Sequence, residues 1–173
     1  MNNISVKNGV HAGISIVIIG SILHAIDQRL FLNSFGFAGY AVFLFFMIKS
    51  VRQTRMAEDG ILPFGPAFVA ALIPMTIGVF FSSAFQYAIH NWINPEIVEL
   101  IKEVAIESAV MMTEKMSEMF GVDTGSQEDM IKLLEEQDYR LSFGATFLSW
   151  FLTTIMGCVP ALIIAAFMKR GEE

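Results

Sequence analysis

The sequence predicts an all-α protein whose helices span a membrane. Of its 173 residues, 54% are hydrophobic and only 16% are charged, whereas a soluble domain carries about a quarter charged residues. The apolar residues, 16 Phe among them, are clustered in long runs, and the mean hydropathy is +0.58. A helix needs about 20 apolar residues to cross a bilayer. We therefore expect one polytopic membrane domain over residues 1–173, with four transmembrane helices and a polar helical insert.

The four expected spans lie at about residues 10–32, 34–56, 64–90 and 143–168. The first follows Lys7, a pattern that also fits a secretory signal, but no small-x-small cleavage pattern follows Ile26, so we expect this span to be retained. The last two contain Pro74 and Pro160. A membrane helix tolerates such prolines because its neighbours re-satisfy the freed carbonyl groups.

The second span has the shortest apolar core, Phe35–Ile48. Asn33 or Ser34 can cap its start. At its other end, the long side chains of Lys49 and Arg52 can reach the polar interface from within the lipid. We therefore expect this segment to cross the membrane.

Basic residues at the span ends predict the orientation. One side of the membrane would receive Lys7, Lys49, Arg52, Arg55, Lys169 and Arg170. Because Lys and Arg are enriched in short cytoplasmic loops, we expect both termini in the cytoplasm. The polar insert, residues 91–142, then lies outside.

The insert is predicted to form an acidic helical hairpin. Between Pro95 and Arg140 it holds twelve acidic and four basic residues, a net charge of −8 against −6 for the whole chain. Asn94 and Pro95 favour a helix start, since one can cap the helix and the other has a preset φ. The segment GVDTGS at residues 121–126 is typical of a turn, and a second amphipathic helix follows it.

The first hairpin helix carries an apolar stripe whose members recur at helical spacing: Ile97, Ile101, Val104, Met112, Met116 and Met119. We expect this stripe to contact a membrane-protein partner or a second copy, because flexible Met side chains suit exchangeable interfaces. The simpler alternative is packing against the second hairpin helix. Thioethers also suit Cu(I), but no Cys or His accompanies them, so we expect no metal and no cofactor.

His24 and Asp27 form the one candidate polar pair, three residues apart on one helix face. A carboxylate can tune an imidazole, and ionisable groups within a membrane are functional candidates. We favour a hydrated, capping role, because the apolar run ends at Ile26. Gly9 and Gly13 have the small-xxx-small spacing that lets helices approach closely, and we favour packing within the chain over a dimer contact.

Several function classes are excluded by missing motifs. The sequence has no Walker loop, dinucleotide fingerprint, HExxH or GxSxG pattern, and its acidic insert disfavours nucleic acid. We predict no catalytic residue and expect an accessory or scaffold subunit rather than an enzyme. The alternative is a small transporter or a lipid- or glycolipid-handling protein. A path for polar solutes needs ionisable groups at mid-depth, and the second, third and fourth spans have none there.

Two segments resemble a known family. They are DGILPFGPAFVAALI at Asp59–Ile73 and YAIHNWINPEIVE at Tyr87–Glu99, and an acidic, Met-rich helix follows before the last span. Together they resemble the bacterial membrane proteins catalogued as domain of unknown function 4199. The resemblance implies a four-span fold, and it transfers no catalytic residue. With the orientation that the basic residues predict, we expect a protein of the bacterial inner membrane, in contact with lipid, whose insert lies in the periplasm.

Overall fold

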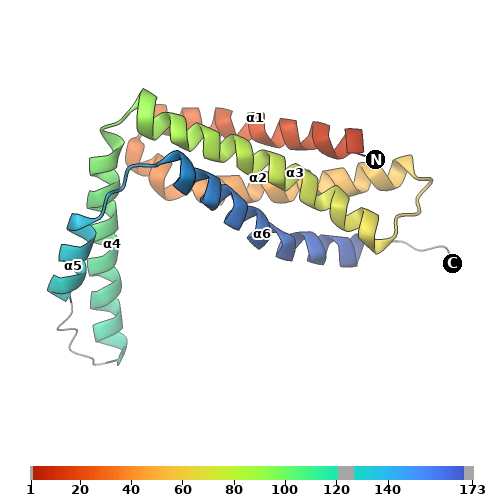
Figure 1. Ribbon diagram of the computed structural model, residues 1–173. Helices are drawn as coiled ribbons and strands as arrows, with labels where there is room; N and C mark the ends of the chain where they lie inside the picture. Colours follow the sequence, from red (N-terminus) through yellow and green to blue (C-terminus); the bar gives the residue numbers. More distant parts are fainter. Residues whose placement is uncertain (1, 121–126, 170–173) are drawn as a thin grey trace. The chain divides into compact units, whose positions relative to one another are not determined.

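The computed structural model describes residues 2–120 and 127–169 (Figure 1). Every regular element in these ranges is a helix: α1 (Asn2–Ile26), α2 (Gln28–Ala57), α3 (Phe64–Ala88), the π-helix η1 (Ile89–Ile93), α4 (Ile97–Phe120), α5 (Gln127–Glu136) and α6 (Phe143–Met168). Four helical segments are long and apolar enough to cross a membrane: Asn3–Ile26, Gln28–Ala57, Phe64–Ile93 and Phe143–Met168. The prediction of an all-helical protein with four membrane-length helices is confirmed.

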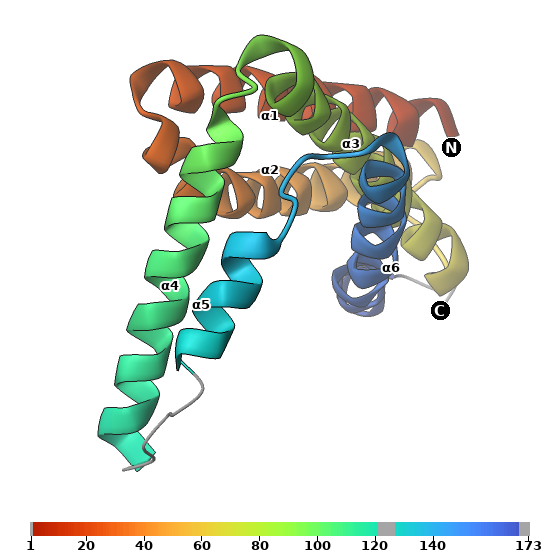
Figure 2. The same ribbon diagram turned by 60° about the vertical axis from the view of Figure 1, so that its left-hand side comes forward.

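The chain divides into two compact units. The four-helix unit, Met1–Tyr87 with Ser142–Glu173, contains α1, α2, α3 and α6, and consecutive helices in it run in opposite directions (Figures 1 and 2). The second unit, Ala88–Leu141, contains η1, α4 and α5. Each unit is described by itself below.

The turn between the first two membrane-length helices lies at Asp27. Its backbone is extended, and its carboxylate accepts a hydrogen bond from the backbone N–H of Leu30, with 2.7 Å between oxygen and nitrogen. Asp27 is therefore the N-cap of α2. The expected boundary at Asn33 or Ser34 was wrong, and so were the spans at 10–32 and 34–56, because the apolar residues after Asp27 already belong to α2.

Helices α1 and α3 approach closely along a row of glycines. A Cβ atom placed on Gly9 would lie 2.8 Å from the Cβ of Ile77, and one on Gly13 would overlap the ring of Phe81. Ile77 and Phe81 stand one helical turn apart, as the two glycines do. The small-xxx-small pair thus packs within the chain, as the sequence favours, and brings the two backbones together.

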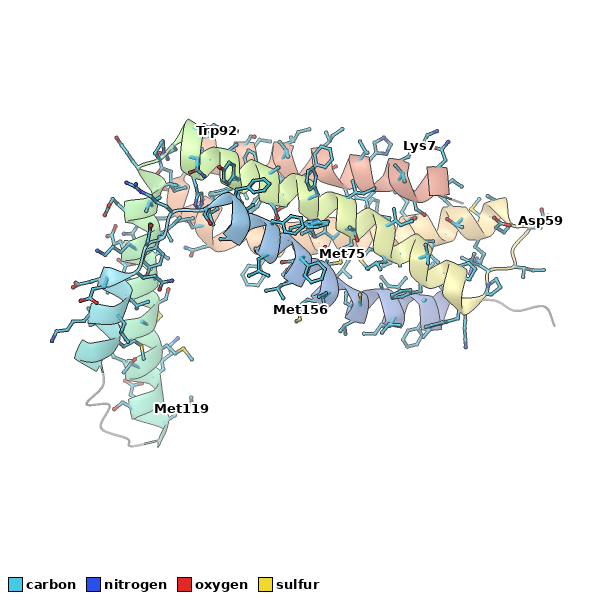
Figure 3. All side chains as sticks on the ribbon, in the orientation of Figure 1. Lys7, Asp59, Met75, Trp92, Met119 and Met156 are labelled. Atoms are coloured by element: carbon cyan, nitrogen blue, oxygen red, sulfur yellow. The ribbon has the colours of Figure 1, made fainter. Side chains whose placement is uncertain are left out.

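Helix α6 rests on α3 by another close contact. A Cβ atom on Gly157 would overlap the Sδ atom of Met75, whose side chain is only 2% exposed. The outward side of α6 carries exposed apolar side chains, including Leu148, Leu152, Ile155, Met156, Val159 and Ile163. Figure 3 shows Met156 pointing away from the unit. A helix with this pattern is suited to a position where one side packs on protein and the other faces lipid.

Candidate functional site

The second unit begins and ends at one place. The side-chain amide of Asn91 donates a hydrogen bond to the backbone carbonyl of Leu141, with 3.1 Å between nitrogen and oxygen, although the two residues stand 50 positions apart. The chain therefore leaves η1, forms α4 and α5, and returns to its starting point before α6. Such a closed excursion is a candidate binding element rather than a simple connector.

Helix α4 begins at Ile97, two residues after the expected Pro95. The backbone N–H of Ile97 donates to the carbonyl oxygen of Asn94, and that of Glu99 donates to the carbonyl oxygen of Glu96, each at 3.1 Å. Bonds that span three residues make a tight turn. Asn94 thus starts the helix with its backbone carbonyl.

Helices α4 and α5 pack against each other within the second unit (Figures 1 and 2). On α4, Thr113 is buried, and its hydroxyl donates to the carbonyl oxygen of Ala109 at 2.8 Å. On α5, Ile131 and Leu134 are half-buried. These residues mark the inward sides of the two helices. Since α4 has 24 residues and α5 only 10, α5 covers only part of α4.

The predicted contact stripe becomes more exposed from the start of α4 to its end. Burial falls from Ile97, which is buried, through Ile101 and Val104, which are half-buried, to Met112 and Met119, which are 65% and 73% exposed. Figure 3 shows Met119 near the end of α4. The side chain of Met116 lies outside the described ones. The described Met side chains of this stripe are therefore open to a partner.

A shallow groove of about 390 Å³ lies on another side of α4. It is lined by Ile106, Glu107, Val110, Met111 and Glu114. Met111 is 54% exposed and directly precedes Met112 in the chain, so the groove adjoins the exposed Met side chains. Apolar walls with carboxylates suit an apolar segment that also carries basic residues.

The structure gives His24 and Asp27 separate roles. Asp27 caps α2 through its bond to Leu30. The His24 ring lies edge-on to Phe31, with 5.4 Å between ring centroids, and its buried Nδ1 atom has no hydrogen-bond partner. Within the described residues, no hydrogen bond or ion pair joins His24 to Asp27. The geometry supports a packing role for His24 and the expected capping role for Asp27.

The described residues contain no cluster of side chains suited to a metal ion. In residues 2–120 and 127–169, no group of three or more His, Cys, Asp or Glu side chains is placed to hold a metal ion. The thiol of Cys158 donates to the carbonyl oxygen of Thr154, with 3.8 Å between sulfur and oxygen. This weak bond lies within one turn of α6.

Sequence reasoning missed a set of polar residues between α1 and α2. Ser5 and Asn8 on α1 and Ser50 and Thr54 on α2 are all buried. On each helix they stand three or four positions apart, which places them on one face. In the sequence they stand among other polar and basic residues such as Lys7 and Gln53, so spacing alone does not identify them.

The comparisons with known proteins give a family and no function. A family model described as "Protein of unknown function (DUF4199)" matches residues 7–170. No curated protein and no solved structure matches the chain. The match spans both units, from Lys7 in α1 to the end of α6.

Proposed function

The chain belongs to this family of proteins of unknown function, and we propose that it is a non-enzymatic accessory or scaffold subunit of the bacterial inner membrane. The four-helix unit would anchor the protein in lipid. The second unit would form an external acidic hairpin that contacts a membrane-protein partner. The observation that carries this proposal is the exposure of Met112 and Met119 on α4.

The proposed orientation rests on the distribution of basic residues. Lys7 and Asp59 lie at the same end of the four-helix unit (Figure 3). The helix ends on that side also carry Lys49, Arg52, Arg55 and Lys169. This excess favours a cytoplasmic location for that end. Helix α3 then leads to the opposite, external side, where the second unit follows it in the chain.

A protein suits the exposed stripe of α4 better than lipid does. Exposed apolar patches on a helix surface mark interaction sites. Membrane surfaces are anionic, and the helices that lie on them carry Lys and Arg on their polar face. From Ile97 to Phe120, α4 carries five glutamates and two lysines, so electrostatic repulsion opposes lipid binding. Flexible Met side chains adapt well to a protein surface.

The charge of the hairpin favours a basic partner over a second copy. Residues 95–140 carry twelve acidic and four basic side chains, a net charge of −8. Two such hairpins in contact would bring like charges within the Debye length of about 8 Å at physiological ionic strength. A partner with basic side chains around an apolar patch would instead match the groove that holds Glu114.

Photo-crosslinking in intact cells tests the contact. A photoreactive amino acid replaces Met112 or, in a matched control, Glu136, which is also exposed but lies on α5, outside both the Met stripe and the groove. We expect position 112 to give an adduct with a second membrane protein in higher yield than position 136. An adduct of twice the chain's own mass would identify a second copy and reject the basic partner. The absence of protein adducts at both positions would reject the scaffold function.

A substitution separates partner binding from folding. Since Met112 is exposed, Met112→Glu should leave the melting temperature of the purified protein unchanged and abolish the crosslink formed from Met119. Thr113→Glu places a charge at a buried neighbouring position and should lower the melting temperature, because an unpaired buried charge is strongly destabilising. A collapse of the melting temperature with Met112→Glu would instead show that this stripe is internal packing.

A further inference from the structure

Two hydrogen bonds join α1 to α2 near the end of the four-helix unit that carries Lys7. The Ser50 hydroxyl donates to the hydroxyl oxygen of Ser5 at 3.0 Å. The Asn8 amide nitrogen donates both to the side-chain oxygen of Gln53, at 2.8 Å, and to the backbone carbonyl of Ile4, at 3.0 Å. Asn8 is only 3% exposed, so these bonds hold it in one position between the helices.

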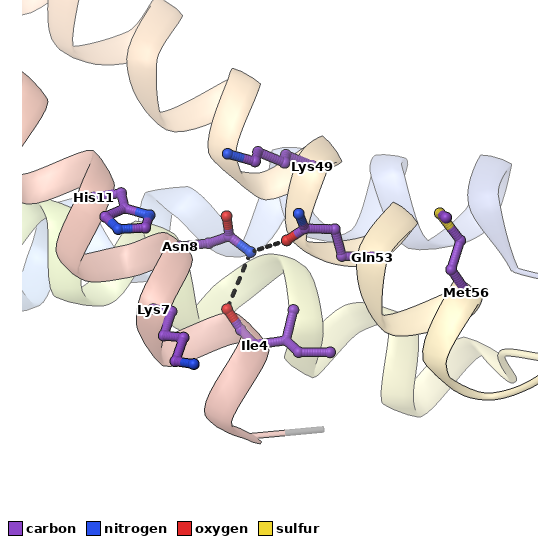
Figure 4. Close-up of a pocket in the computed structure, with 7 residues that line it drawn as sticks. All are labelled: Ile4, Lys7, Asn8, His11, Lys49, Gln53 and Met56. Carbon is purple, nitrogen blue, oxygen red and sulfur yellow. Dashed lines mark hydrogen bonds between the residues drawn. The ribbon is translucent and has the colours of Figure 1, made fainter.

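A pocket of about 410 Å³ lies beside these hydrogen bonds, between α1 and α2 (Figure 4). From α1 it is lined by Ile4, Lys7, Asn8 and His11, and from α2 by Lys49, Gln53 and Met56. On each helix the lining residues recur three or four positions apart, so two facing stripes form the walls. Two of the lining side chains are lysines, and none is acidic.

The buried Asn8 determines which group Gln53 offers to the pocket. The Gln53 side-chain oxygen is occupied, because it accepts the bond from Asn8. The amide nitrogen of Gln53 then remains as a donor for something else. Figure 4 shows the oxygen of this amide toward Asn8 and the nitrogen turned away from it.

Lys49 is held at the pocket wall by aromatic rings. Its ammonium nitrogen lies 5.2 Å from the centroid of the Phe46 ring and 6.0 Å from that of Phe45. A cation at such a distance is attracted by the ring face. The His11 ring packs on the same Phe46 ring, with 6.5 Å between centroids. Phe46 therefore places a lysine and a histidine beside each other at the pocket.

We propose that this pocket binds the phosphate group of an anionic ligand. Lys7 and Lys49 supply positive charge, and the Gln53 amide supplies a directed N–H donor. Lysine is a common phosphate ligand in proteins, and basic pockets between transmembrane helices bind phospholipid headgroups. The apolar side chains of Ile4 and Met56 line the same opening and are suited to the first part of an acyl chain.

The phosphate has two sources that share this chemistry, a membrane phospholipid and a soluble phosphate ester. The pocket lies near the end of two membrane-length helices, where lipid headgroups are abundant. This site is separate from α4 and does not depend on the function proposed for the second unit.

Native mass spectrometry of the full chain, released from nanodiscs, tests the site. The nanodiscs hold equal amounts of phosphatidylglycerol and phosphatidylcholine. We expect retained phosphatidylglycerol on the wild type and about thirtyfold weaker retention on the double variant Lys7→Gln/Lys49→Gln. The matched control, Arg52→Gln/Arg55→Gln, removes two charges from the same end of α2 outside the pocket lining and should retain lipid as the wild type does.

Gln53→Glu gives a second test that spares the fold. A carboxylate still accepts the bond from Asn8 but replaces the N–H donor by a negative charge. We expect loss of phosphatidylglycerol with unchanged circular dichroism. Equal loss in the lysine and arginine double variants, or retention of phosphatidylglycerol on Gln53→Glu, would overturn the site.

A final arm identifies the source of the phosphate. Inorganic phosphate and glycerol phosphate are added to the wild type in lipid-free detergent. A rise in melting temperature that Lys7→Gln/Lys49→Gln abolishes and Arg52→Gln/Arg55→Gln retains supports the site with a soluble ester. Retention of phosphatidylglycerol without such a rise supports the site with lipid. If neither occurs, the proposal is wrong.

Discussion

The indole N–H of Trp150 donates a hydrogen bond to the backbone carbonyl of Thr76, with 3.1 Å between nitrogen and oxygen, and so ties α6 to α3. Gly157 stands seven residues further along α6, on the same helix face, and lies against Met75 of α3. One directional bond and one close contact therefore dock α6. Each can be tested separately.

Trp150→Phe should destabilise the protein by about 0.5–1 kcal/mol, because it removes the indole donor while it keeps an aromatic ring. Unfolding by a denaturing detergent, followed by circular dichroism, measures the change. Tyr40→Phe is the control, since Tyr40 is an exposed aromatic residue on α2 and loses only its hydroxyl. Equal effects of the two substitutions would show that the Trp150 bond contributes nothing.

Gly157→Ala should destabilise the protein by about 1–3 kcal/mol, because the added methyl group overlaps the side chain of Met75. Gly144→Ala on the same helix meets no atom within 4 Å and should be neutral or slightly stabilising. Adding Met75→Ala to Gly157→Ala should recover part of the loss, and a thermodynamic cycle measures this coupling. If the two changes are additive, the proposed contact is not the cause.

Asp27→Ala should cost about 1 kcal/mol of stability, because α2 loses its N-cap. Asp27→Asn should stay within a few tenths of a kcal/mol of the wild type, since asparagine caps a helix about as well. A large loss with asparagine would mean that the negative charge matters beyond capping, and it would revive a chemical role for His24 with Asp27. Thermal melts of both variants make the comparison.

Topology reporters check the orientation. A reporter fused after Glu173, or inserted after Ala57, should read as cytoplasmic, because both positions adjoin basic residues. A reporter within residues 121–126, which lie outside the described residues, should read as external. A cytoplasmic signal from 121–126 would invert the proposed orientation of the second unit and contradict the proposed contact with an external partner.

The sequence predicts the class of fold well, because a run of about 20 apolar residues leaves a helix across the bilayer as the stable choice. It predicts the first turn poorly. Leu30 and Phe31 continue the apolar pattern beyond Asp27, so the first span was expected to run to residue 32 and the second to start at Asn33 or Ser34. A single polar residue can end a membrane helix without any change in average hydropathy.

The sequence also predicts only part of each candidate site. Helical spacing places Ile97 and Met119 on one side of α4, but spacing alone does not tell where a neighbour of 10 residues begins and ends. The structure is therefore needed to show that Ile97 is buried and Met119 is exposed. Likewise Asn8 and Gln53 stand 45 residues apart, and their pairing depends on the register of two helices that the sequence leaves open.

The hydrogen bond from Asn91 to Leu141 has a consequence for how such proteins diversify. This bond brings together the two ends of the segment that contains α4 and α5. That segment can therefore be replaced by another one without a new connection between η1 and α6. A relative could thus carry a different second unit while its four-helix unit stays unchanged. In the laboratory, a short flexible bridge from Asn91 to Leu141 should leave the four-helix unit folded and abolish the proposed partner contact.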